Sequence, residues 1–144
     1  MLNSSAERPI AVIDSGVGGI SVLKELTVLL PEEDFLFFGD EANAPYGTKS
    51  RTDVCSITVN NVKKLIVDYN IKAVVIACNT ATGASVGVLR NMYPEMPIIG
   101  IEPEIKTAAF SSEHPTVLIM ATPLTLSQPK FLYLKNKYRK KADF

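Results

Sequence analysis

Five short apolar runs, separated by stretches with helical spacing, most constrain what this chain can fold into. The runs are unbroken rather than alternating, which is typical of strands buried on both faces of a parallel sheet. They lie at residues 10–13, 35–38, 73–77, 97–101 and 117–121. Helices are predicted at about 20–30, 50–69, 80–92, 102–110 and 125–138. This alternation predicts an α/β fold with a doubly wound, mostly parallel sheet.

Composition narrows the class of protein. A chain of 144 residues with 47% hydrophobic and 21% charged residues is expected to fold as an ordinary globular domain. Its 15 Lys and Arg residues are balanced by 15 Asp and Glu residues. We therefore expect no electrostatic partner such as nucleic acid or an anionic membrane. The apolar runs are too short to cross a bilayer, and the first nine residues hold no signal-peptide core.

The small number of cysteine and histidine residues excludes disulfide scaffolds and zinc-cluster proteins. Cys55, Cys78 and His114 are too few for a disulfide scaffold or a Cys/His zinc cluster, so we predict no metal and a reducing, cytoplasmic location. Cys55 falls inside a helical pattern and is expected to be an inert core residue. His114 falls in a polar loop and is expected on the surface.

Three polar segments follow predicted strands, where ligands bind in open α/β sheets, and they lie at residues 14–19, 39–48 and 78–82. The first, Asp14-Ser15-Gly16-Val17-Gly18-Gly19, could cradle an anion at a helix N-terminus. It is a poor dinucleotide fingerprint because Ser21 stands at the third glycine position, and the Asp14 carboxylate would repel a pyrophosphate. The glycines could simply form a tight turn, but a turn alone does not explain Asp14 and Ser15 at a strand end.

The segment Cys78-Asn79-Thr80-Ala81-Thr82 is the most informative of the three. Cys78 lies where a buried strand ends and a helix begins, and the helix N-terminus would favour a thiolate there. A phosphatase-type C-x5-R loop is excluded because residue 84 is alanine. The alternative, that Cys78 is a small core residue and Thr80 a helix cap, stays open.

The three segments together resemble the glutamate racemase family. The resemblance is carried by DSGVGG at 14–19, by PYG at 45–47 in a GD…PYGT context, and by CNTAT at 78–82, and it extends through most of residues 10–125. It implies a Rossmann-like three-layer sandwich. It also implies an incomplete first domain at residues 1–100 and the start of a second, similar domain at 101–144.

The resemblance also implies a chemistry and a set of site residues. Cys78 would be the first of two catalytic cysteines, acting beside Asp14. The residues expected to bind glutamate are Asp14, Ser15, Pro45, Tyr46, Gly47, Asn79, Thr80 and Thr122. The family interconverts L- and D-glutamate without a cofactor or metal and supplies D-glutamate for peptidoglycan. A base on one face of the α-carbon and an acid on the other would suffice for this reaction.

One departure from the family pattern leaves alternatives open. The second catalytic cysteine belongs to a later Cys-Thr-His segment that this sequence lacks. We therefore expect a fragment, a truncated gene product or a domain with another role, with little racemase activity alone. A homo-oligomer is expected to cover the apolar surface of such a half. The competing hypotheses are a non-catalytic amino-acid-binding module and, less favoured, a cysteine-nucleophile transferase.

Overall fold

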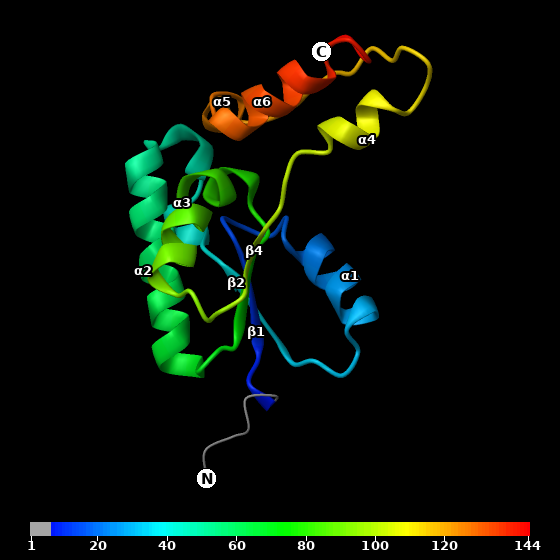
Figure 1. Cartoon of the computed structure of the whole chain (residues 1–144). Coiled ribbons are helices and arrows are strands. Elements are labelled where there is room, and N and C mark those ends of the chain that lie inside the picture. The colour runs from blue at the N-terminus through cyan, green and yellow to red at the C-terminus, as the bar shows by residue number, and fades with distance from the viewer. Residues whose placement is uncertain (1–6) are drawn as a thin grey trace.

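A computed structural model describes residues 7–144 and contains a four-stranded parallel sheet (Figure 1). The strand order is β2-β1-β3-β4, and every pairing is parallel. The strands are β1 (Ile10–Asp14), β2 (Phe35–Gly39), β3 (Ala73–Ile76) and β4 (Ile98–Gly100). Four of the five predicted strands are therefore present, and the predicted α/β class is confirmed.

Helices cover both faces of the sheet and make three layers (Figure 1). The helix α1 (Ile20–Leu29) packs with Leu23 and Leu26 on the face that carries Val12 and Val75. The helices α2 (Arg51–Tyr69) and α3 (Asn79–Met92) lie on the other face and enclose the larger apolar cluster. This arrangement places the carboxyl ends of the strands next to the first turns of the helices.

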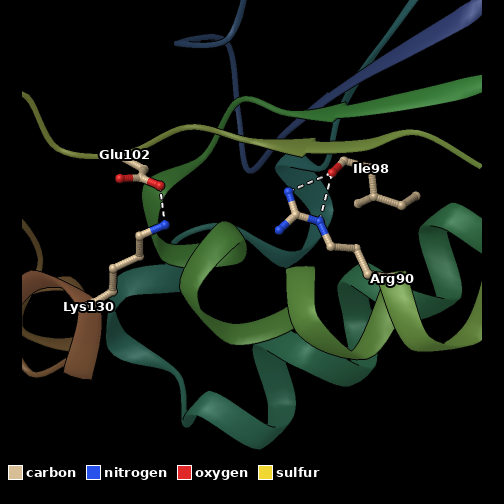
Figure 2. Close-up of polar contacts among 4 residues, drawn as sticks. All are labelled: Arg90, Ile98, Glu102 and Lys130. Carbon is tan, nitrogen blue, oxygen red and sulfur yellow. Dashed lines mark hydrogen bonds and ion pairs between the residues drawn. The ribbon is translucent and has the colours of Figure 1, made fainter. Parts of the chain in front are cut away.

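Burial differs between central and edge strands. Every residue of β1 and β3 is buried, as the continuous apolar runs predict. The prediction of burial on both faces is wrong for β2, whose residues are half-buried or exposed, and for most of β4. Each of these strands has a neighbour on one side only, so the helices cover it less completely. The Arg90 guanidinium holds β4 against α3 by donating two hydrogen bonds to the Ile98 carbonyl, at 2.9 and 3.0 Å (Figure 2).

Local chemistry sets the bounds of α2 and α3. The Ser50 hydroxyl accepts a hydrogen bond from the Asp53 amide at 3.1 Å and caps the start of α2, and the C-cap residue Asn70 after the helix is in the left-handed conformation. In α3 the N-cap residue is Cys78, which makes no side-chain capping bond. Thr80 lies inside the helix, so the open alternative that Thr80 caps α3 is wrong.

The prediction of a fifth strand at residues 117–121 is wrong. This segment forms no strand, and the side chains of Leu118 and Met120 are 85% and 89% exposed. Apolar residues make a strand only where another backbone offers a ladder of hydrogen bonds. Among residues 7–144, the bridge between Thr116 and Asp143 is the one β-type pairing beside this segment.

Three further helices follow β4 and lie beyond the carboxyl ends of the strands (Figure 1). They are α4 (Ile105–Ala109), α5 (Pro123–Leu126) and α6 (Pro129–Tyr138). The single helix predicted at 125–138 is thus divided, because Pro129 starts a new helix at its first position. The short helix α5 packs against α3 and against the 3₁₀ turn η3 (Tyr46–Thr48). None of the helices among residues 7–144 is both long and apolar enough to span a membrane.

Candidate functional site

Cys78 and Ser15 meet across the carboxyl ends of β3 and β1. The Cys78 Sγ atom lies 3.6 Å from Ser15 Oγ, and Cys78 is 9% exposed. Ser15 immediately follows β1, and Cys78 lies between β3 and the first turn of α3. Two polar groups that are 63 residues apart in sequence therefore come together only because β1 and β3 are parallel neighbours.

Asp14 is the last residue of β1, directly precedes Ser15 in the chain and is buried. Its carboxylate accepts a hydrogen bond from the Gly16 amide at 3.2 Å. At Gly19, a Cβ atom would lie 2.8 Å from Asp14 Cβ and 3.0 Å from Ala77 Cβ. Glycine is therefore required at this position for the turn to pass this close to both strand ends. The glycine-rich turn consequently does more than reverse the chain: it packs directly on Asp14.

A second cluster is centred on Asp40, which is 5% exposed just after β2. Its carboxylate accepts hydrogen bonds from Tyr46 Oη at 2.6 Å, Asn61 Nδ2 at 2.8 Å and Asn43 Nδ2 at 2.9 Å. Burial alone would raise the pKa of the Asp40 carboxyl, but the hydrogen bonds from these three side chains outweigh it. The pKa is therefore held below its ordinary value, and Asp40 stays ionised.

Tyr46 is 2% exposed and remains a hydrogen-bond donor to Asp40. Burial raises the pKa of the Tyr46 hydroxyl well above its usual range, and its hydrogen bond to Asp40 and the negative charge of Asp40 add to the effect. The Asp40–Tyr46 pair thus anchors the loop that carries Pro45, Tyr46 and Gly47. Pro45 itself is exposed, and the bond between Ala44 and Pro45 is cis.

We expect Asp40→Asn to lower the free energy of unfolding by about 1–3 kcal/mol near neutral pH, because the buried donors lose an ionised acceptor. The folded-state pKa of Asp40 is below its ordinary value of 3.8. Its contribution is therefore present above about pH 4 and is lost as the pH falls through the folded-state value. Urea unfolding of wild type and Asp40→Asn near pH 7 and at about pH 3 measures this difference in the free energy of unfolding.

The control for this prediction is Asp68→Asn, which removes an exposed carboxylate from the same helix that carries Asn61. It should change the free energy of unfolding by no more than about 0.5 kcal/mol at either pH. A difference between wild type and Asp40→Asn that persists undiminished in acid would contradict the assigned role of the charge.

Three threonine hydroxyls join α5 to the first turn of α3. Thr80 Oγ1 lies 3.1 Å from Thr122 Oγ1 and 3.0 Å from Thr125 Oγ1, and the latter two are 3.0 Å apart. Thr122 also caps α5 by accepting a hydrogen bond from the Thr125 amide. Its methyl group lies against Gly47, where any Cβ atom would overlap it. Thr122 thereby connects η3 with α3.

A cavity of about 460 Å³ opens beside these threonines. Its polar lining includes Asn79, Thr80, Thr122 and Thr125, and its apolar lining comes largely from α4 and residues 117–121. The Asn79 Oδ1 atom is buried and has no hydrogen-bond partner within the described chain. A buried acceptor without a partner is costly, so this amide is suited to a ligand that supplies a donor.

The structure therefore divides the predicted site residues into linked groups. Cys78 and Ser15 are in contact at the ends of β3 and β1, and Asp14 directly precedes Ser15 but makes its hydrogen bond to the Gly16 amide. Asn79, Thr80 and Thr122 line the cavity, and Gly47 is linked to them through Thr122. The lining of the cavity includes neither Cys78 nor Asp14, although Cys78 directly precedes Asn79 in the chain.

Several polar residues of this region were not predicted as site residues. Asp40 belongs to the second polar segment predicted at a strand end, but no role was predicted for its carboxylate. Asn61 and Thr125 carried no signal in the sequence: Asn61 lies within α2, and Thr125 is polar in a segment expected to be an ordinary helix. His114 is exposed, as expected, and its ring lies 3.6 Å from the Asp143 carboxylate. Residues 7–144 contain no group of His, Cys, Asp and Glu that could hold a metal ion.

A parallel α/β sheet with a thiol, carboxylates and hydroxyls gathered at its carboxyl end is typical of proteins that bind or transform small molecules. No protein-family model matches the chain. The chain is 52% identical over 140 residues to glutamate racemase of Clostridium acetobutylicum, covering 97% of this chain and 54% of that protein. It is 51% identical over 137 residues to glutamate racemase of Clostridium novyi, covering 95% and 52%.

Solved structures give the same result. The structure of Escherichia coli glutamate racemase in complex with L-glutamate and the activator UDP-MurNAc-Ala matches with a TM-score of 0.83 and 31% identity, covering 94% of this chain and 52% of that one. The Thermus thermophilus glutamate racemase complex with β-chloro-D-alanine matches with a TM-score of 0.74 and 34% identity, covering 91% and 50%. This chain is thus a homologue of the glutamate racemases, which are isomerases, and the resemblance seen in its motifs is confirmed. The chain spans about half the length of the curated relatives it matches.

Proposed function

We propose that this chain takes part in the racemisation of glutamate, with Cys78 as the acid–base group on one face of the α-carbon. The observation that carries the proposal is about 50% identity to glutamate racemases along nearly the whole chain. The contact between Cys78 Sγ and Ser15 Oγ supports it, because it places the thiol among polar groups at the carboxyl ends of the strands. Related structures are described as complexes with D-glutamate and with L-glutamate.

The proposed chemistry needs only proton transfer. A thiolate at Cys78 removes the α-proton of D-glutamate. In the reverse direction, when L-glutamate loses its α-proton on the opposite face, the Cys78 thiol delivers a proton to the planar intermediate. The proposed chemistry uses no cofactor or metal. The pocket itself must therefore stabilise the carbanion through preorganised dipoles. Asp14 is buried next to the thiol-bearing segment and is proposed to assist Cys78, while Ser15 fixes the position of its sulfur.

Glutamate itself is proposed to be bound by residues from three strand ends. Ser15 follows β1, the Pro45-Tyr46-Gly47 loop follows β2, and Asn79 and Thr80 follow β3. Thr122 completes the set from α5. The unpartnered Asn79 Oδ1 is a suitable acceptor for the substrate ammonium group. We propose, with this assignment, that residues 1–100 form a first domain and 101–144 the start of a second.

The biological role proposed from the family is supply of D-glutamate for peptidoglycan and hence for cell shape. A cytoplasmic location suits the two free cysteines, Cys55 and Cys78. The exposed Leu118 and Met120 favour association with a second copy of this chain, which sedimentation would test.

Titration with D-glutamate, followed by NMR, tests the binding part of this proposal. We expect saturable amide shifts at Ser15, Gly47 and Thr80, because these residues come from the three strand ends assigned to the substrate. The matched ligand is D-alanine, which lacks the side-chain carboxylate and should produce weaker shifts at the same concentration. Shifts confined to other parts of the chain, or none at all, would overturn the assignment.

A further inference from the structure

Gln128 is a buried polar residue to which neither the sequence motifs nor the proposed reaction gives a role. It is 8% exposed and stands at the N-cap of α6, but its side chain makes no capping bond there. Instead, Gln128 Nε2 donates a hydrogen bond to the Thr80 carbonyl at 3.3 Å. Thr80 belongs to the first turn of α3, which directly follows Cys78.

Gly83 provides the space for this contact. Any Cβ atom at position 83 would overlap the side-chain amide of Gln128, so the amide lies directly against the glycine. The Gly83 carbonyl is also bound by Arg51, whose Nη2 atom donates a hydrogen bond at 3.3 Å. The start of α3 is therefore held at two carbonyls, that of Gly83 by Arg51 of α2 and that of Thr80 by Gln128, the N-cap residue of α6.

We propose that Gln128 is a positioning residue for the turn that carries Cys78, Asn79 and Thr80. Its amide fixes the backbone at Thr80, and the hydroxyls of Thr122 and Thr125 fix the Thr80 side chain. Through these contacts, helix α5 and the start of helix α6 set the orientation in which Cys78 Sγ reaches Ser15. This inference rests on the proposed function for its catalytic meaning, but the positioning itself is independent of any ligand.

Alkylation of the two cysteines by iodoacetamide tests the proposal. Peptide-level mass spectrometry measures Cys78 and Cys55 separately in the same sample of the full chain. In Gln128→Met the side chain keeps its length but loses the amide donor. We expect Cys78 to react at least about fivefold faster, because a displaced turn breaks the contact with Ser15 and exposes the sulfur. Cys55, half-buried in α2, should change by less than about twofold and reports any general loosening.

Gly83→Ala is the second variant, and it separates positioning from stability. Alanine favours a helix more than glycine does, so this change should leave the helix at least as stable by propensity. Its new methyl group nevertheless displaces the Gln128 amide, and we expect the same acceleration at Cys78 as in Gln128→Met. The control is Lys130→Met, which breaks the exposed ion pair between Lys130 and Glu102 near the start of α6 and should leave both rates unchanged (Figure 2).

The results distinguish this inference from the proposed function. If Cys78 reacts within twofold of the wild-type rate in both Gln128→Met and Gly83→Ala, Gln128 does not position the turn. If Cys55 accelerates in parallel, or Lys130→Met has the same effect, the role is merely structural and the proposal is overturned. Protection of Cys78 by D-glutamate in the wild-type chain is a separate measurement, and its absence would count against the proposed function while leaving the rates in the variants interpretable.

Discussion

Replacing Cys78 with alanine is expected to abolish exchange of the α-proton of D-glutamate with deuterated solvent. Positioned acid–base groups contribute about 10²–10⁴-fold to proton transfer, and Cys78 is the thiol at the strand ends in the described part of this chain. The rate should therefore fall by about that factor, to the level of free glutamate in buffer. Following the α-proton signal by NMR measures it, because exchange removes the signal without any change in ligand concentration.

Cys55→Ala is the matched control for this prediction. It removes the other thiol, that of Cys55, which is half-buried in α2 against the apolar cluster. Its effect should be confined to a modest loss of stability, with the exchange rate per folded molecule unchanged. If both variants lose exchange equally, the sulfur of Cys78 has no special role.

The same measurement discriminates between the enzyme and a binding module. A module that retained the pocket without catalysis would bind D-glutamate in the NMR titration, but wild type and Cys78→Ala would exchange the α-proton at the same slow rate. The proposed racemase chemistry predicts binding together with exchange that depends on Cys78.

The positions of Asp14, Ser15 and Cys78 were predictable because of topology. Once continuous apolar runs indicate parallel strands, the residues that follow each run must share one edge of the sheet. The pairing of β1 with β3 brings Ser15 and Cys78 to 3.6 Å in this way. Their chemical roles remain predictions, because a shared edge says which groups are neighbours and not which of them reacts.

Long-range side-chain contacts were not predictable by the same argument. Asn61 reaches Asp40, and Gln128 reaches the Thr80 carbonyl, from helices whose rotation about their own axes depends on packing. The pattern of apolar residues fixes which face of a helix is buried, but it does not say which buried polar side chain will find a partner.

The incorrect prediction of a strand at residues 117–121 has a different cause. An apolar run of that length predicts burial, yet it does not specify what buries it. In the structure Val117 and Ile119 are half-buried and Leu118 and Met120 are exposed, and all four line the cavity beside Thr122. Strand formation depends on a partner as well as on sequence, and the described residues give this segment a bridge at Thr116 rather than a ladder.

Racemisation by the 144-residue chain alone is expected to be slower than its exchange of the D-glutamate α-proton by about 10²–10⁴-fold. Cys78 serves one face of the α-carbon, and inversion needs a proton donor on the other face. Cys55 cannot supply it, because it lies within α2 and packs against the apolar cluster, so water would have to, and water is not a positioned acid. Exchange of D-glutamate should also exceed that of L-glutamate, because the proposed chemistry assigns the α-proton of the D-isomer to Cys78. Circular dichroism of the glutamate pool measures racemisation, and NMR measures exchange in the same sample. Equal rates of exchange for both isomers, together with full two-way racemisation that survives Cys78→Ala, would overturn the mechanism and the assignment of Cys78 at once.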